Sequence, residues 1–501
     1  MPTSEIPWKK IAVFDINHGG LSIAKQLKKH GISVVAFDVY GKASPEKLKE
    51  FEDENGYPVS SNVNDIETEE FEIVCLPIHL NPENEYYKKA IEGSLPTITH
   101  HEMVGRILRS DSRIADMNMI EITGVRGKTS TAILLAQMLS FKDKVLLHTS
   151  EGLSYWEKEK TQKIKPGISI TPAYIPDLID CALSQGYRPT TLIFEVSLGY
   201  TGSQDIGILT EAQPDYLIGG GAMSSTDAKT KLISRSKEGS IFVINYDDLE
   251  TIEKYIRDDQ ELVVFDDSGA AIEDNTPTDV YLNVATGKDG TETVDIESSR
   301  TGIFFRTELN TGYNIHSYKT AMAAAVATAL ELDVSEAQIT EIISSFSGVE
   351  GRMREYEENG CFVMDNSNSG LTIDSAEMSL NYMLEKYLNK KSPNYDADKT
   401  GYVWLIIGEE DKTVCEGLEP KEIENFLKNY AEDIQKTIFV GSRIKTHIES
   451  RKNQPIENAE ELEDLEFETA LYADTFKDGM KKAFENANEG DIIIAAVKCF
   501  R

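Results

Sequence analysis

A run of consecutive residues has the types and the spacing that phosphate binding requires. They are Gly124, Val125, Arg126, Gly127, Lys128, Thr129 and Ser130, within the stretch EITGVRGKTSTAILLAQML at 121–139. Glycines let the backbone turn tightly, so that several N–H groups point inward at an anion. A lysine supplies a charge for a β- or γ-phosphate, and a threonine or serine hydroxyl is a ligand for Mg²⁺. The stretch predicts a loop that holds a nucleoside triphosphate.

The segments on either side of this loop must position it. An apolar, strand-like run precedes Gly124, and an apolar, helix-like run begins at Lys128. The positive end of that helix would add to the attraction for phosphate. Only two residues separate the glycines, fewer than in the common G-x-x-x-x-G-K-[ST] loop. The alternative is a glycine-rich turn beside a surface lysine, but the order strand, loop, Lys-Thr-Ser and helix favours the phosphate loop.

Short apolar runs alternate with helical patterns along most of the chain, which is typical of βαβ units and parallel sheets. A length of 501 residues is too great for one core and suggests about three domains. The sequence predicts an α/β protein with an N-terminal domain over 1–117, a central domain over 118–350 and a C-terminal domain over 351–501.

The composition excludes several classes of protein. The formal net charge of −34 argues against binding of nucleic acid, whose phosphates would be repelled. Five cysteines without a C-x-x-C pair indicate neither a zinc site nor a disulfide framework. We find neither an apolar run of membrane-spanning length nor a signal-peptide core at the N-terminus. We therefore expect a cytoplasmic protein whose partner is a small molecule, with no membrane and no nucleic acid.

The pattern T-G-x-x-G-K-T-[ST] at the head of a central domain, between two further α/β domains, resembles the Mur ligase superfamily. The resemblance implies a Rossmann-like N-terminal domain that binds substrate, a P-loop central domain that binds ATP and a Rossmann-like C-terminal domain. It also implies the chemistry. These enzymes use ATP and Mg²⁺ to convert a carboxylate to an acyl phosphate, which a nucleophile then attacks.

The resemblance implies a set of metal ligands. LIFEVSLG (192–199) is similar to the second metal segment of the family, which makes Glu195 a ligand beside Thr129 and Ser130. A carboxylate at the end of a strand is a suitable hard oxygen donor. DAKTKLISRSKEGSIFVINYDD (227–248) resembles the helix whose lysine is carbamylated in many relatives and helps to hold a second Mg²⁺. Lys229 is that candidate, and an ordinary helical surface lysine is the alternative.

Three more residues come from the same resemblance. GYNIHSYKTAMAAAVA (312–327) looks like the segment that contacts the nucleotide, so Asn314 would approach the adenine or ribose. FSGVEGRMREY resembles the family hinge, and its Arg352 would clamp the γ-phosphate with a planar, permanent charge. Asp365 stands where relatives carry a ribose-binding aspartate. The implied catalytic set is Lys128, Glu195, Lys229 and Arg352.

The sequence departs from the family in one segment. Relatives commonly carry D-H-x-D after the fourth strand of the central domain, and its histidine binds the second metal. Here the stretch is PDYLIGGGAMSSTDAK (214–229), which contains no histidine. The sequence therefore does not decide whether a second metal site is present. The triple glycine at 219–221 indicates close approach of the backbone to another group.

Other segments concern the substrate. The first βα turn, NHGGLSIA (17–24), is not the dinucleotide pattern G-x-G-x-x-G, but a two-glycine turn before a helix still suits an anion, and His18 lies inside it. Four segments together resemble one branch of the Mur ligases, which completes coenzyme F(430), the nickel tetrapyrrole of methanogenic metabolism. These segments are HTSEG (148–152) and residues 195–210, 219–229 and 365–370. That branch implies closure of a carbocycle on a seco nickel tetrapyrrole, in which a ring carbon attacks the acyl phosphate.

Two other functions stay open at this point. One is a Mur-type amide ligase that adds an amino acid to a pseudomurein or other cell-wall precursor. The other is an ATP-binding subunit without turnover, which the missing D-H-x-D histidine motivates. The base that takes the proton from the attacking carbon is also open, since His100, His101, His148 and His316 could all serve by chemistry alone.

Overall fold

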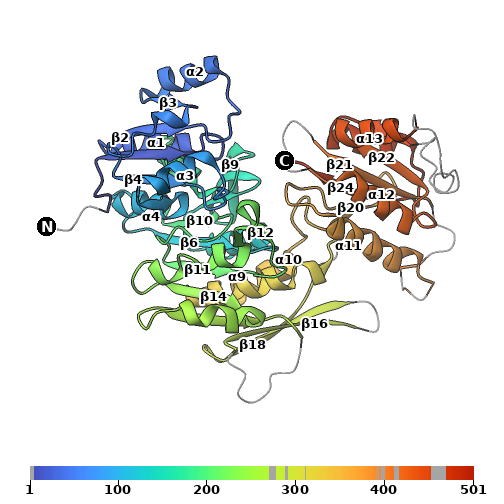
Figure 1. The fold of residues 1–501 in the computed structure, drawn as a ribbon. Helices are drawn as coiled ribbons and strands as arrows, with labels where there is room; N and C mark the ends of the chain where they lie inside the picture. Colours follow the sequence, from blue (N-terminus) through green and yellow to red (C-terminus); the bar gives the residue numbers. More distant parts are fainter. Residues whose placement is uncertain are drawn as a thin grey trace. The chain divides into compact units, whose positions relative to one another are not determined.

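The computed structural model describes residues 5–269, 278–287, 291–310, 312–390, 392, 394–395, 401–410, 417–452 and 470–500 (Figure 1). The chain forms two compact units. The first contains Met1–Asn283, Asp295–Phe305 and Lys319–Ile342, and the second contains Val284–Val294, Arg306–Tyr318 and Ile343–Arg501. The predicted α/β class is confirmed, and the domain boundaries near 117 and 350 stay predictions.

The N-terminal sheet is wholly parallel, with strand order β3-β2-β1-β4-β5. Its strands are β1 (Lys10–Phe14), β2 (Ser33–Phe37), β3 (Val59–Ser60), β4 (Ile73–Leu76) and β5 (Thr97–Thr99). Its helices are α1 (Gly20–Lys29), α2 (Pro45–Asn55), α3 (Glu85–Glu92) and α4 (His100–Ser110). The strand order reverses between β1 and β4, and ligands of doubly wound sheets bind beyond the carboxyl ends of the strands at such a switch point.

The central sheet has the strand order β18-β17-β16-β15-β14-β11-β6-β10-β7-β8-β9. Its parallel core is made of β6 (Asn118–Thr123), β7 (Val145–Thr149), β10 (Thr191–Glu195), β11 (Ile206–Leu209), β14 (Ile241–Asn245) and β15 (Glu261–Asp266). β6 lies between β10 and β11, so the loops beyond the carboxyl ends of these three strands meet at one edge of the sheet. This arrangement positions the candidate site.

The remaining strands of this sheet and the helices around it complete the central part. The strands are β8 (Gly152–Glu157), β9 (Lys160–Pro166), β16 (Val280–Thr286), β17 (Glu292–Ser298) and β18 (Ile303–Glu308), with a separate two-stranded pair of β12 (Leu217–Ile218) and β13 (Met223–Ser224). The helices are α5 (Lys128–Leu139), α6 (Ile175–Ser184), α7 (Ser225–Thr230), α8 (Leu249–Ile252), α9 (Lys319–Glu331) and α10 (Glu336–Ser345). Alanine-rich α9 is buried almost all round and packs against α5.

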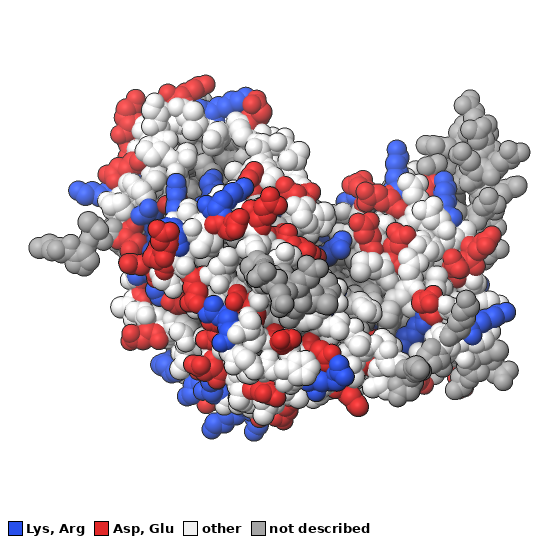
Figure 2. Space-filling view, turned by 90° about the horizontal axis from the view of Figure 1, so that it is seen from below, with Lys and Arg blue, Asp and Glu red and all other residues white. Residues whose placement is uncertain are grey.

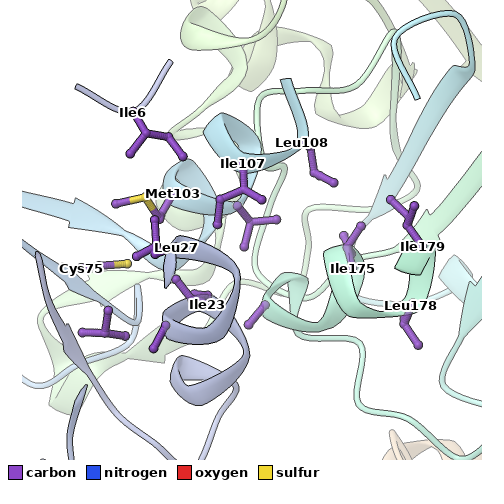
Figure 3. Packing of buried hydrophobic residues seen from close by; sticks show 14 of the residues in the cluster. Ile6, Ile23, Leu27, Cys75, Met103, Ile107, Leu108, Ile175, Leu178 and Ile179 are labelled. Carbon is purple, nitrogen blue, oxygen red and sulfur yellow. The ribbon is translucent and has the colours of Figure 1, made fainter. Parts of the chain in front are cut away.

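One hydrophobic core joins the N-terminal sheet to the central sheet. Ile23 of α1 and Met103 of α4 belong to the same buried cluster as Ile175 of α6 (Figure 3). Burial of each such side chain contributes about 1.5–3 kcal/mol. Polar contacts reinforce the junction, since Ser22 Oγ and Gln26 Nε2 each donate to the Asp177 carboxylate at 2.6 Å. The N-terminal sheet and the parallel core of the central sheet therefore belong to one compact unit.

The second unit contains a mainly parallel sheet of its own, with strand order β19-β20-β24-β21-β22-β23. Its strands are β19 (Arg354–Glu358), β20 (Cys361–Asp365), β21 (Val403–Glu409), β22 (Lys436–Val440), β23 (Leu471–Ala473) and β24 (Ile492–Lys498), and only β19 is antiparallel among the pairs that are described. Its helices are α11 (Ile373–Met383), α12 (Pro420–Asn429), α13 (Ser442–Lys452) and α14 (Phe476–Asn486).

The surface agrees with the acidic composition. On the face drawn in Figure 2, Lys and Arg lie among Asp and Glu rather than in a separate basic patch. Each helix in the described part of the chain is too short or too polar to cross a lipid bilayer.

Candidate active site

The predicted phosphate loop joins the end of β6 to the start of α5. Gly124 has φ 145° and Gly127 has φ 80°, which are conformations that side chains disfavour. A Cβ at Gly124 would also lie 2.1 Å from Thr210 Oγ1. Gly127 is the residue before α5, and Lys128 begins that helix. The two glycines are therefore required by the turn itself, and they leave the loop backbone at the positive end of a twelve-residue helix.

Contacts hold the loop against the end of β11. Val125 N donates to Glu211 O at 2.8 Å, and Thr210 Oγ1 donates to Arg126 O at 2.5 Å. Lys128 Nζ donates to the carbonyl oxygen of Gly124 at 3.0 Å. An ammonium group in this position is within reach of an anion that the loop would cradle.

The two predicted metal ligands Thr129 and Glu195 meet at the carboxyl edge of the central sheet. Thr129 Oγ1 donates to Glu195 Oε2 at 2.9 Å, and Ser150 N donates to the same oxygen at 3.1 Å. Thr129, Ser130 and Glu195 are all buried. A carboxylate beside a hydroxyl is a hard oxygen donor set, which is the kind that Mg²⁺ takes up. These residues fit a magnesium site, and Ser150, inside the segment HTSEG, adds a contact for which the sequence assigned no role.

Lys229 is buried in helix α7 and is only 1% exposed. Its Nζ donates to Ser225 Oγ at 2.8 Å. Burial and the nearby charge of Lys128 lower the pKa of Lys229 to about 8, although Asp215 and Asp248 act in the opposite direction. The charge of Lys128 therefore acts on Lys229, and a common site for the two lysines stays a prediction. The alternative of an ordinary surface lysine is wrong, because the side chain is buried.

A lysine with this pKa should be carbamylated more readily than an ordinary one. Carbamylation needs the neutral amine, and a pKa of about 8 in place of 10.5 increases the neutral fraction at neutral pH about 300-fold. We expect a carbamate signal in the ¹³C NMR spectrum of protein in ¹³C-bicarbonate, rising from pH 7 to pH 9 with a midpoint near 8. The signal should be absent from Lys229→Arg and present in Lys231→Arg. Equal signals in these two variants would contradict the expectation.

The other three predicted residues lie together in the second unit. Asp365, at the end of β20, accepts hydrogen bonds from Gly351 N at 3.2 Å and Ser367 N at 3.1 Å. Asn314 N donates to Met353 O, one residue beyond Arg352. The structure thus gathers Asn314, Arg352 and Asp365 around the loop before β19. That this group and the phosphate loop act on one nucleotide stays a prediction.

Two histidines of the first unit, His100 and His101, have backbone carbonyl partners. Nε2 of His100 lies 2.9 Å from Phe14 O, and Nε2 of His101 lies 2.7 Å from Ser197 O. Since a carbonyl only accepts, each Nε2 carries the proton that it donates. Burial lowers the pKa of His100, His101 and His148 to about 4. His100 and His101 therefore act as neutral donors that tie chain segments together.

Comparison with known proteins identifies the family. Residues 122–327 match the Mur ligase middle domain, and residues 355–499 match the description "Coenzyme F430 synthetase CfbE, C-terminal domain". The coenzyme F(430) synthetase of Methanosarcina acetivorans is 37% identical over 496 residues, covering 98% of this chain and 99% of that protein. The chain belongs to the coenzyme F(430) synthetase family of Mur ligases. The predicted membership of the Mur ligase superfamily, its F(430) branch and the prediction of an ATP-dependent ligase are confirmed.

More distant matches place this synthetase family among the Mur ligases. A UDP-N-acetylmuramoylalanine–D-glutamate ligase of Caldicellulosiruptor bescii is 23% identical, covering 99% of this chain and 94% of that one. The crystal structure of MurF from Acinetobacter baumannii aligns with a TM-score of 0.55 at 12% identity, covering 95% of this chain and 94% of that one. The second likeness shows the fold alone. It agrees with the predicted three-domain Mur-ligase architecture.

The segment that lacks the D-H-x-D histidine contacts the loop after β4. A Cβ at Gly220 would lie 2.4 Å from Asn81 Nδ2, and one at Gly219 would lie 3.5 Å from His79 O. The close approach predicted for the triple glycine is therefore made by the loop after β4 of the N-terminal sheet.

Two acidic residues near the phosphate loop, Glu211 and Asp248, were given no role from the sequence. Asp248 accepts a hydrogen bond from Ala212 N at 2.7 Å, and Glu211 holds the loop through its carbonyl. Burial raises the pKa of both carboxyl groups above their ordinary values. Both residues lie within three positions of the end of a strand of the parallel core, which is the sequence signal that could have found them.

Proposed function

We propose that this chain closes a carbocycle on a seco nickel tetrapyrrole to give coenzyme F(430), with ATP converted to ADP and phosphate. The observation that carries the proposal is the 37% identity to the Methanosarcina acetivorans synthetase over nearly the whole of both chains. Mur ligases as a family use ATP and Mg²⁺, and the Thr129–Glu195 contact offers a matching donor set. Nickel enters as part of the substrate, so the protein needs no ligand set of its own for this reaction.

The bonds of the proposed reaction balance. A substrate carboxylate oxygen takes the terminal phosphoryl group of ATP, and ADP leaves. A ring carbon of the macrocycle then loses a proton and attacks the acyl carbon, which forms the C–C bond and breaks the C–O bond to phosphate. The product is a six-membered cyclic ketone. Phosphate is a good leaving group, whereas the free carboxylate is a poor electrophile.

The chain's own residues supply charge and position. Lys128 and the loop N–H groups would hold the β- and γ-phosphates, and Thr129, Ser130 and Glu195 would hold Mg²⁺, with Lys229 at a second metal position. Bound Mg²⁺ supplies neutralisation of the phosphate charge. Arg352 would clamp the γ-phosphate, and Asn314 and Asp365 would contact the nucleoside. In this proposal, such groups would orient the carboxylate and keep water away from the acyl phosphate.

The substrate decides between this function and the amide ligase. We expect the purified chain with ATP and Mg²⁺ to release phosphate when a seco nickel tetrapyrrole is added without any amine. The cyclised product should appear by absorption and mass spectrometry in equal amount to the phosphate. Release that requires an amino acid and a cell-wall precursor would contradict the proposal and favour the amide ligase. Omission of ATP is the control.

A further inference from the structure

Three metal-ligating side chains meet at the switch point of the N-terminal sheet. Asp15 and His18 come after β1, and His79 comes after β4, the neighbouring strand. Each residue offers one ligand atom, and these atoms all lie within 4.8 Å of one another. The parallel strands β1 and β4 are paired through Ile11 and Ile73, so residues beyond their carboxyl ends are necessarily neighbours.

The carboxylate of this cluster is held in place from several sides. Asp15 is completely buried, and its Oδ1 accepts hydrogen bonds from Asn17 N at 2.9 Å and His18 N at 3.2 Å. Its Oδ2 lies 2.7 Å from His18 Nδ1. Asn17 is fixed in turn, since its side chain donates to Asp38 Oδ1 at 3.2 Å. Hydrogen bonds that orient a ligating group are what metal sites use to set their geometry.

The two imidazoles lie edge to face and are only partly buried. The ring centroids of His18 and His79 are 5.5 Å apart with planes at 86°. The side chain of His18 is 36% exposed. Tyr40 also packs against His18, with ring centroids 5.7 Å apart. His79 lies on the loop that packs against Gly219 and Gly220, so its backbone is supported by the central part of the first unit.

We propose that Asp15, His18 and His79 bind a divalent first-row transition-metal ion of the Zn²⁺, Co²⁺ or Ni²⁺ class. Two imidazole nitrogens and one carboxylate favour these ions over Mg²⁺ or Ca²⁺, which prefer oxygen ligands only. Ligand atoms at about 2.0–2.2 Å from one ion lie within about 4.4 Å of one another, so small side-chain movements complete the set. Three protein ligands leave further coordination positions for water or a ligand group.

This site is chemically separate from the magnesium site at the phosphate loop. The latter consists of Thr129, Ser130 and Glu195 on the central sheet, all of which offer oxygen. A titration with transition-metal ion in the absence of nucleotide therefore addresses the histidine cluster. It requires neither turnover nor the tetrapyrrole, so its result is independent of the proposed function.

Binding of Co²⁺ provides the test, because its visible ligand-field absorption reports imidazole ligation. The full chain without an affinity tag is first dialysed against a chelator and then titrated with CoCl₂. We expect one equivalent to bind, Zn²⁺ to displace it, and excess Mg²⁺ to leave it in place. His18→Gln and His79→Gln should each raise the Kd at least about 100-fold, the upper range for loss of a metal site's supporting group. His30→Gln removes an exposed histidine of the same domain and should change nothing.

The result that overturns the proposal is equally direct. A wild-type spectrum equal to that of hydrated Co²⁺ would do so, as would unchanged affinity in both glutamine variants. Circular dichroism and ATP binding of each variant check that the chain is folded. A second measurement needs no substitution. Paramagnetic Co²⁺ should broaden the imidazole NMR signals of His18 and His79 before those of His30, and uniform broadening would also overturn the proposal.

Discussion

Replacing Lys128 by alanine is expected to lower kcat by on the order of 10²–10³-fold, with the fold retained. Lys128 begins α5, and its Nζ donates to Gly124 O of the loop at 3.0 Å. In phosphoryl transfer, a cation in that position stabilises charge that develops on the transferred group. Alanine is a strong helix former, so the helix should survive the change.

The measurement is the rate of ADP and product formation under saturating ATP and Mg²⁺. Lys163→Ala is the matched control, because it removes an exposed lysine of the first unit far along the chain from the loop. A Lys128→Ala enzyme with normal turnover would contradict the assignment of this loop to the triphosphate. Normal cellular function of the same variant would favour the ATP-binding subunit without turnover.

Replacing Glu195 by glutamine is expected to reduce kcat by a similar factor, on the order of 10²–10³-fold, and to raise the Mg²⁺ concentration needed for half-maximal rate. Glu195 is buried at the end of β10, where Thr129 Oγ1 and Ser150 N donate to its Oε2. Glutamine keeps an acceptor oxygen and the side-chain volume, so both donors can stay satisfied. It removes the negative charge, which is what attracts a divalent cation.

Initial rates over a series of Mg²⁺ concentrations measure this effect, and the thermal midpoint checks folding. Glu238→Gln serves as the control because it removes an exposed carboxylate in the same unit. An identical Mg²⁺ dependence for Glu195→Gln and the wild type would exclude Glu195 as a metal ligand. If the rate and the Mg²⁺ dependence of Glu238→Gln change as well, the change seen in Glu195→Gln comes from the loss of a negative charge anywhere in the unit and not from the loss of a metal ligand.

The clearest agreement between sequence and structure concerns residues that a short, contiguous stretch of sequence predicted. The phosphate loop is one contiguous strand, turn and helix, and the positive φ angles of Gly124 and Gly127 follow from the turn. Glu195 was placed by the resemblance of its segment, and it ends a strand beside β6. Parallel strands deliver their carboxyl ends to one edge, which is why Thr129 and Glu195 meet although 66 residues separate them.

The burial of Lys229 and the hydrogen-bond partners of the histidines could be known only from the folded chain. The burial of Lys229, and hence its lowered pKa, depends on how α7 packs against the turn at Gly199, where a Cβ would lie 2.9 Å from Lys229 Cα. Sequence left His100 and His101 open as bases, whereas the fold gives each a backbone carbonyl as partner. Such partners come from distant segments, and periodicity within one helix cannot report them.

The sequence by itself determined the phosphate loop, the acidic residues at strand ends, the α/β fold class and membership of a ligase family. Only the tertiary structure brought Asp15, His18 and His79 within 4.8 Å of one another. The physical reason is the crossover connection. Residues after β1 and β4 are separated by two further strands in the chain, and become neighbours only when the parallel sheet places β4 beside β1.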